Sequence, residues 1–127
     1  MKHKLSERSL SRLNGVHPDL VRLIKAASVN APVDFQITEG LRSYERQRRL
    51  VKAGASGTMN SRHLTGHAVD VVCLVDDKVR WDWPLYEKLA EHVKKKAREM
   101  NIRITWGGDW RKLRDGPHYE LSRKHYK

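Results

Sequence analysis

One run of eight residues, 68–75 (AVDVVCLV), constrains the fold more than any other stretch of the chain. It is apolar and rich in β-branched side chains except at Asp70, a composition typical of a mostly buried strand. Because side chains alternate along a strand, Asp70 faces the same side as Ala68 and Val72. An unpaired carboxylate is costly to bury among apolar neighbours, so Asp70 requires a cation.

Hydrophobic periodicity predicts further helices and strands around this run. The predicted elements are helix 18–28, strand 33–38, helix 43–54, strand 68–75, helix 82–100, strand 102–106 and strand 117–121. Loops are predicted over 55–61 and 107–116, with a turn at 76–78. Since this order contains no regular βαβ repeat, it favours an α+β fold, in which a short, mostly antiparallel sheet packs against helices.

The length of 127 residues suits one domain with a substantial core. We interpret the polar, basic residues 1–12 as a lead-in to it. The only cysteine, Cys73, cannot form an internal disulfide and is expected to be a small buried side chain. No window reaches the roughly 18 apolar residues of a membrane span, and the N-terminus does not resemble a signal peptide. A cytoplasmic protein is therefore expected.

The charge balance restricts the possible partners. Twenty-six Lys and Arg against fifteen Asp and Glu give a formal charge of +11, which favours binding to polyanions. The basic residues are spread along the chain rather than interleaved with aromatic residues, which disfavours a stacking surface for single-stranded nucleic acid. No zinc-finger or RNP-like spacing occurs either. Nucleic acid, an anionic membrane face and the bacterial envelope remain as candidate partners.

The segment 61–70 (SRHLTGHAVD) is the densest group of potential metal ligands in the chain. A catalytic zinc site typically has three protein ligands and leaves a position for water. His63, His67 and Asp70 are candidates, and spacing alone does not choose between the two histidines. His118 is the best candidate from elsewhere, because Asp115 lies three positions before it. Alternatively, Asp70 pairs with an arginine and both histidines are solvated loop residues.

This segment resembles the S-x-H-x-x-G-x-A-x-D signature of the M15 family of zinc peptidases. The family contains VanY-like D-Ala-D-Ala carboxypeptidases and single-domain phage endolysins that cleave L-alanyl-D-glutamate bonds. Two other family elements match as well, an acidic residue three positions before a histidine and an arginine after a strand-ending glycine. The matching residues are Ser61, His63, Gly66, Ala68 and Asp70 in the signature, Asp115 with His118, and Arg42.

The resemblance implies a zinc ion bound by His63, Asp70 and His118, in a fold like that of hedgehog domains and DD-peptidases. His67 stands where the signature is open, and we interpret it as solvated. If residues 117–121 form a strand, Glu120 lies on the same face as His118. Glu120 then either competes for the role of base or orients this ligand.

Catalytic roles are implied by the same resemblance. Asp115 would take a proton from the attacking water and pass it to the leaving amine. Arg42 would stabilise the oxyanion or bind a substrate carboxylate, and Ser61 is also assigned to substrate binding. We interpret Asp109, in WGGDW, as structural support near the site.

The implied function is that of a phage endolysin, a zinc-dependent endopeptidase that hydrolyses the L-alanyl-D-glutamate bond of peptidoglycan for host lysis. The expected enzyme is a monomer without a separate wall-binding module or a specific nucleic-acid partner. It waits in the host cytoplasm until another phage protein opens the membrane, and its charge then holds it on the anionic envelope. The alternatives are a D-Ala-D-Ala carboxypeptidase or dipeptidase, a nucleic-acid-binding domain with a structural metal, and a non-catalytic zinc-containing relative.

Overall fold

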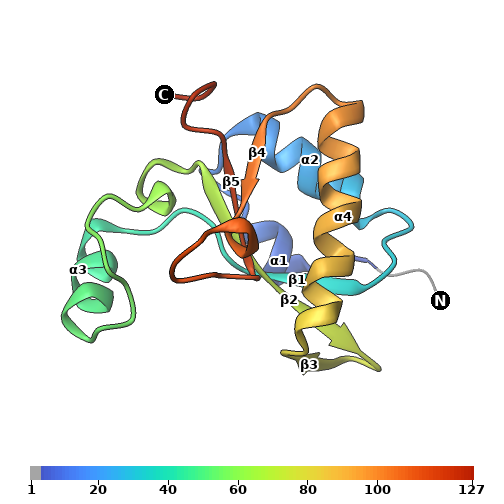
Figure 1. The fold of residues 1–127 in the computed structure, drawn as a ribbon, viewed down its shortest axis with the longest axis horizontal. Helices are drawn as coiled ribbons and strands as arrows, with labels where there is room; N and C mark the ends of the chain where they lie inside the picture. Colours follow the sequence, from blue (N-terminus) through green and yellow to red (C-terminus); the bar gives the residue numbers. More distant parts are fainter. Residues whose placement is uncertain (1–3) are drawn as a thin grey trace.

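The computed structural model describes residues 4–127, which form an antiparallel sheet with helices packed around it (Figure 1). The predicted α+β class is confirmed, and each predicted helix and strand is present. In chain order the elements are α1 (Glu7–Ser11), α2 (Pro18–Ser28), β1 (Asp34–Glu39), α3 (Tyr44–Lys52), η1 (Arg62–Thr65), β2 (Ala68–Val75), β3 (Lys78–Arg80), α4 (Trp83–Glu99), β4 (Ile104–Trp106), η2 (Gly107–Asp109) and β5 (His118–Leu121).

The apolar, β-branched residues 68–75 form the central strand, β2. The strand order is β1-β2-β5-β4, with β3 also paired to β2, and all pairs are antiparallel. In this register Asp70 lies between Glu39 of β1 and His118 of β5. Partners directly opposite in an antiparallel pair project to the same face. The sheet therefore brings Asp70 and His118 together.

The other face of the sheet is covered by the hydrophobic core. α2 and α4 pack against each other, and their apolar stripes join one cluster with the side chains that alternate with Asp70 on β2. These strand residues are Val69, Val71 and Cys73, each at most 1% exposed. The expectation that Cys73 is buried is confirmed. One face of the sheet is thus apolar and packed against the core, and the opposite face is polar.

The lead-in predicted for residues 1–12 contains a short helix in its described part. Residues 7–11 form α1, which begins where the Ser6 hydroxyl accepts a hydrogen bond from the Ser9 N–H. The Ser9 hydroxyl is buried, contacts Gln36, and accepts a hydrogen bond from the Ile37 N–H at 2.9 Å. A polar side chain caps this helix, which is too short to show an apolar stripe in the sequence. Hydrophobic periodicity therefore did not predict it. Residues 1–3 of the lead-in lie outside the described part.

Two further features go beyond the sequence prediction. The turn predicted at 76–78 becomes a tight hairpin through Asp76 and Asp77, both with positive φ, and leads into the short exposed strand β3. α3 lies apart from α2 and α4 (Figure 1), and its buried residue is the polar Gln47. Over residues 4–127, no helix has both the length and the apolar character needed to cross a bilayer.

Candidate metal and peptidase site

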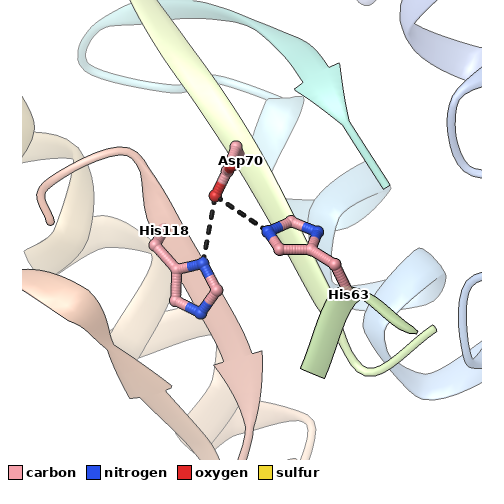
Figure 2. A group of neighbouring side chains, drawn as sticks. All are labelled: His63, Asp70 and His118. Carbon is pink, nitrogen blue, oxygen red and sulfur yellow. Dashed lines mark hydrogen bonds and ion pairs between the residues drawn. The ribbon is translucent and has the colours of Figure 1, made fainter. Parts of the chain in front are cut away.

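Three of the predicted site residues meet on the polar face of the sheet. Figure 2 shows His63 from η1, Asp70 from β2 and His118 from β5 converging on one point. The potential ligand atoms all lie within 4.8 Å of one another. Asp70 Oδ1 is 3.2 Å from His63 Nε2 and 3.0 Å from His118 Nδ1. His67 is not in this group.

The local fold of the motif explains how His63 reaches the site. The Ser61 hydroxyl caps η1 by accepting a hydrogen bond from the His63 N–H at 3.2 Å. Gly66 ends η1 with a φ of 76°, and a Cβ at this position would lie 2.4 Å from the Gly15 carbonyl oxygen. Only glycine fits both the left-handed backbone and this close contact. Ser61 and Gly66 therefore define the turn that presents His63.

The contact of the outer nitrogen of His63, the ring nitrogen that points away from Asp70, determines the tautomer of the ring. His63 Nδ1 lies 2.8 Å from the carbonyl oxygen of Gly40, which only accepts hydrogen bonds, so Nδ1 carries the proton. The neutral ring then presents a lone pair at Nε2 towards Asp70. Nε2 is buried and has no hydrogen-bond partner among the described residues. A bound cation would satisfy this otherwise orphaned atom.

His118 is held by carboxylates at both ring nitrogens. Nδ1 lies 3.0 Å from Asp70 Oδ1, and Nε2 lies 2.8 Å from Glu120 Oε1. Burial disfavours the charged ring, but the hydrogen bonds to Asp70 and Glu120 outweigh burial and raise the pKa of His118 to about 9. Burial also opposes the charge of Asp70, yet the hydrogen bond from His118 and the proximity of the His63 ring hold its pKa well below the usual range.

The donor set suits a catalytic metal. Two imidazole nitrogens and one carboxylate form the three-ligand arrangement that leaves a position for water in catalytic zinc sites. The outer nitrogen of each histidine contacts an oxygen, as is usual for metal-bound histidines. The orphaned Nε2 supports the same conclusion. His63, Asp70 and His118 can therefore hold a metal ion.

Asp115 lies beside this group at the end of the loop that precedes β5. Its N–H donates to the Gly107 carbonyl at 3.0 Å, and its own carbonyl accepts from the His118 N–H at 3.2 Å. A Cβ at Gly107 would lie 2.4 Å from the Asp115 carbonyl oxygen, so this approach needs glycine. Burial, followed by the negative charge of Asp70, raises the pKa of Asp115. A raised carboxyl pKa is typical of groups that transfer protons.

Arg42 is the second charged residue that lies near the ligand group. Its Nη2 is 3.7 Å from Asp70 Oδ2, while Nε forms an ion pair with Glu39 and Nη1 donates to Gln47 Oε1 at 2.8 Å. The Arg42 N–H also donates to the His63 carbonyl at 2.9 Å. Sequence reasoning missed Glu39 and Gln47. Nothing in the local sequence separates them from the many other polar residues nearby.

The ligand group opens into a cleft of about 1310 Å³. Residues 54–58, 60 and 61 line the cleft, and so do residues 110 and 113–115. Ser61 and Arg42, both predicted to bind substrate, are part of its lining. The basic side chains outnumber the acidic ones and are Arg42, Arg46, Arg62, Arg114, Arg123 and Lys124. The cleft is therefore suited to an anionic substrate.

Two predicted residues lie outside the ligand group. His67 was interpreted as solvated but is partly buried, with Nδ1 2.6 Å from the Thr65 hydroxyl and its ring 5.5 Å from that of His17. Burial, followed by the charges of Arg62 and His17, lowers the pKa of His67. Asp109 is exposed and pairs with Lys94 at 2.6 Å, so its support consists of a surface contact with α4.

Comparisons with known proteins agree with this geometry. A model of the family "phage L-alanyl-D-glutamate peptidase" matches residues 1–126. The L-alanyl-D-glutamate peptidase of Escherichia phage T5 is 27% identical over 130 residues, covering 99% of this chain and 94% of that enzyme. The peptidase of the same name from Listeria phage A118 is 36% identical over 94 residues, 74% of this chain but only 32% of the relative.

A solved structure extends the similarity to three dimensions. The crystal structure of the Serratia marcescens L-Ala D-Glu endopeptidase ChiX superimposes with a TM-score of 0.91 and 48% sequence identity, covering 98% of this chain and 95% of ChiX. The resemblance to M15 peptidases, inferred from the motifs, is confirmed. Since the family model spans nearly the whole sequence, the chain belongs to the phage L-alanyl-D-glutamate peptidase family.

Proposed function

We propose that this chain is a zinc-dependent endopeptidase that hydrolyses the L-alanyl-D-glutamate bond of peptidoglycan stem peptides. The observation that carries the proposal is the convergence of His63 Nε2 and His118 Nδ1 on Asp70 Oδ1, with each outer nitrogen already hydrogen-bonded. The names of the relatives supply the class of substrate. Zinc is the metal proposed, because three N and O ligands with an open position are characteristic of catalytic zinc.

The residues around the ligands have different roles in the proposed reaction. When bound, zinc polarises the scissile carbonyl and lowers the pKa of water towards neutrality. Asp115 accepts a proton from the attacking water and delivers it to the leaving amine, a task that suits its raised carboxyl pKa. Arg42, held by Glu39 and Gln47, stabilises the oxyanion or binds a substrate carboxylate. Ser61 contributes to the cleft wall beside them.

The charge and the cleft support a wall substrate. Stem peptides carry carboxylates, and basic side chains outnumber acidic ones in the cleft lining. The formal charge of +11 favours retention on an anionic envelope, and this retention weakens with salt because exposed charges are screened within about 8 Å at physiological ionic strength. In the proposed role the monomeric enzyme waits in the host cytoplasm and reaches the wall after a separate phage protein opens the membrane.

Digestion of purified peptidoglycan tests the bond that is cut. The proposal expects new alanine C-termini paired with D-glutamate N-termini, which end-group labelling and mass spectrometry detect. Release of free D-alanine or D-Ala-D-Ala would instead establish the carboxypeptidase or dipeptidase alternative. An intact wall together with tight, salt-sensitive binding to nucleic acid would favour the structural-metal alternative.

The His63→Ala variant tests the metal. Since His63 Nε2 is one of three ligand atoms, its loss should remove both zinc and wall cleavage. Metal content and turbidity loss of outer-membrane-permeabilised cells measure the two effects. His67→Ala is the matched control, because its ring lies outside the group, and it should retain both properties. Equal behaviour of the two variants would contradict the assignment of His63.

A further inference from the structure

Glu120 is a buried carboxylate that the proposed chemistry does not use. On β5 it lies two residues after His118 and therefore on the same face of the sheet, opposite Ala68 of β2 and Thr105 of β4. Its side chain is 7% exposed, and its Oε1 lies 2.8 Å from His118 Nε2. An ionised carboxylate is seldom buried to this degree without a specific partner.

We propose that Glu120 is a positioning residue that prepares His118 to bind the metal. A carboxylate only accepts hydrogen bonds, so Glu120 keeps a proton on His118 Nε2. The lone pair of the metal-bound ring is then confined to Nδ1, the nitrogen that faces Asp70. A carboxylate partner also increases the basicity of a ligating histidine. This inference rests on the proposed role of His118 as a ligand.

His63 and His118 differ in the strength of the hydrogen bond at the ring nitrogen that faces away from the metal position. The outer nitrogen of His63 contacts the neutral carbonyl of Gly40, whereas that of His118 contacts a charged group. Charge-assisted hydrogen bonds are about twice as strong as neutral ones. Replacing Glu120 by glutamine should therefore weaken His118 as a ligand while leaving His63 unchanged.

The carboxylate of Glu120 is itself fixed. Its second oxygen, Oε2, lies 3.4 Å from Arg123 Nε, and Arg123 Nη2 donates to the Asn60 carbonyl at 3.2 Å. One carboxylate oxygen of Glu120 therefore accepts a hydrogen bond from His118, and the other pairs with Arg123. Because Glu120 contacts the ring nitrogen remote from Asp70, it acts through His118, and Asp115 keeps the role of base.

Zinc affinity is the primary test. The purified chain and its Glu120→Gln and Glu120→Ala variants are titrated with zinc in competition with a chromophoric chelator. Loss of a histidine's outer partner typically weakens metal binding by 10–100-fold, so we expect a loss in this range, greater for alanine than for glutamine. Glu99→Gln, which removes an exposed carboxylate 3.8 Å from Lys96, should bind zinc like the wild type.

Two further measurements separate positioning from structural support or base catalysis. In ¹H–¹⁵N NMR of the zinc-loaded wild type, the Nε2–H proton of His118 should be shifted downfield and exchange slowly with water, a signature that Glu120→Ala should lose. At saturating zinc, Glu120→Gln should regain most wall cleavage. Asp115→Asn, by contrast, should bind zinc normally and remain inactive.

The outcomes separate this inference from the proposed function. Wild-type zinc affinity in a folded Glu120→Gln variant would overturn the positioning role even if the wall is cleaved as proposed. Normal zinc affinity combined with lost cleavage would make Glu120 a base instead. If the wild-type chain binds no zinc at all, the proposed function fails together with this inference. Circular dichroism of the metal-free variants confirms that they are folded.

Discussion

At the scale of single residues, the site depends on groups that are held in place before substrate arrives. The guanidinium of Arg42 contacts Glu39, Gln47 and Asp70 through different nitrogens. Lysine carries the same charge but cannot satisfy several fixed acceptors with a planar fork. The orientation of Arg42, and not merely its charge, should therefore determine its contribution.

The Arg42→Lys variant tests this conclusion. We expect wall cleavage to fall on the order of 100-fold, the effect typical of a misplaced catalytic group, while zinc content stays at the wild-type level. Initial rates on purified peptidoglycan and metal analysis provide the measurements. Arg22→Lys is the control, because Arg22 also pairs with an acidic side chain, Asp19, but is 60% exposed and is not part of the cleft lining. A fully active Arg42→Lys enzyme would show that the charge alone suffices.

A second residue-scale prediction concerns two buried phenols. The Tyr119 hydroxyl is buried without a hydrogen-bond partner among the described residues, whereas the Tyr86 hydroxyl accepts from the Cys73 N–H at 3.2 Å and donates to the Arg80 carbonyl at 2.8 Å. Tyr119→Phe should raise the free energy of unfolding by about 1 kcal/mol, and Tyr86→Phe should lower it by a similar amount. Denaturant unfolding measures both. Destabilisation by Tyr119→Phe would indicate that its hydroxyl has a partner.

At the scale of elements, the short helix η1 determines where His63 points, and Gly66 ends it. Gly66 and Gly54 have almost equal φ values, 76° and 77°, but different surroundings. A Cβ at Gly66 would lie 2.4 Å from the Gly15 carbonyl oxygen, whereas one at Gly54 would meet nothing within 4 Å. The pair therefore separates the effect of backbone strain from that of steric conflict.

Substitution of each glycine by alanine measures this difference. Gly54→Ala should cost about 1 kcal/mol, because only the left-handed backbone is strained. Gly66→Ala must also move η1 away from Gly15, so we expect a larger loss of stability together with weaker zinc binding. Thermal unfolding and chelator competition give the two quantities. Equal effects at both positions would show that the contact with Gly15 relaxes without cost.

The same elements show what the sequence can and cannot predict. The β2 strand and the neighbouring motif were predictable because periodicity and ligand types lie in one contiguous segment, 61–75. Glu39 was not predictable, since it reaches the site through the pairing of β1 with β2 and a register shift after Ile37. Gln47 was hidden in a charged helix, and the Gly40 carbonyl has no side-chain signal. Long-range pairing, rather than local pattern, determines the contacts that support the ligands.

At the scale of the whole molecule, β2 connects the candidate site to the core. Asp70 belongs to the ligand group on one face of the sheet, and Val71 and Cys73 project from the opposite face into the apolar cluster. The proposed zinc ligands come together only in the folded chain, so bound zinc would be expected to stabilise the entire fold. A probe in the core should therefore report on the metal site.

Cys73 provides this probe. Burial, only partly offset by a hydrogen bond with Tyr86, raises the pKa of the Cys73 thiol to about 12. At pH 8 the thiolate fraction is then on the order of 10⁻⁴, against roughly a quarter for an exposed thiol of pKa about 8.5. We expect a thiol-reactive dye to label the folded protein very slowly and the denatured protein at once. Rapid labelling without denaturant would show that β2 opens locally.

Zinc should slow this labelling further. If labelling requires global unfolding, the rate in mild denaturant should fall with added zinc in proportion to the stabilisation of the native state, and a chelator should restore it. The His63→Ala variant is the control, because its labelling rate should not respond to zinc. Zinc-independent labelling of the wild type would show that the thiol becomes accessible by an opening that leaves the ligand group intact. Zinc-dependent labelling would establish that β2 joins the ligand group and the core in one cooperative unit.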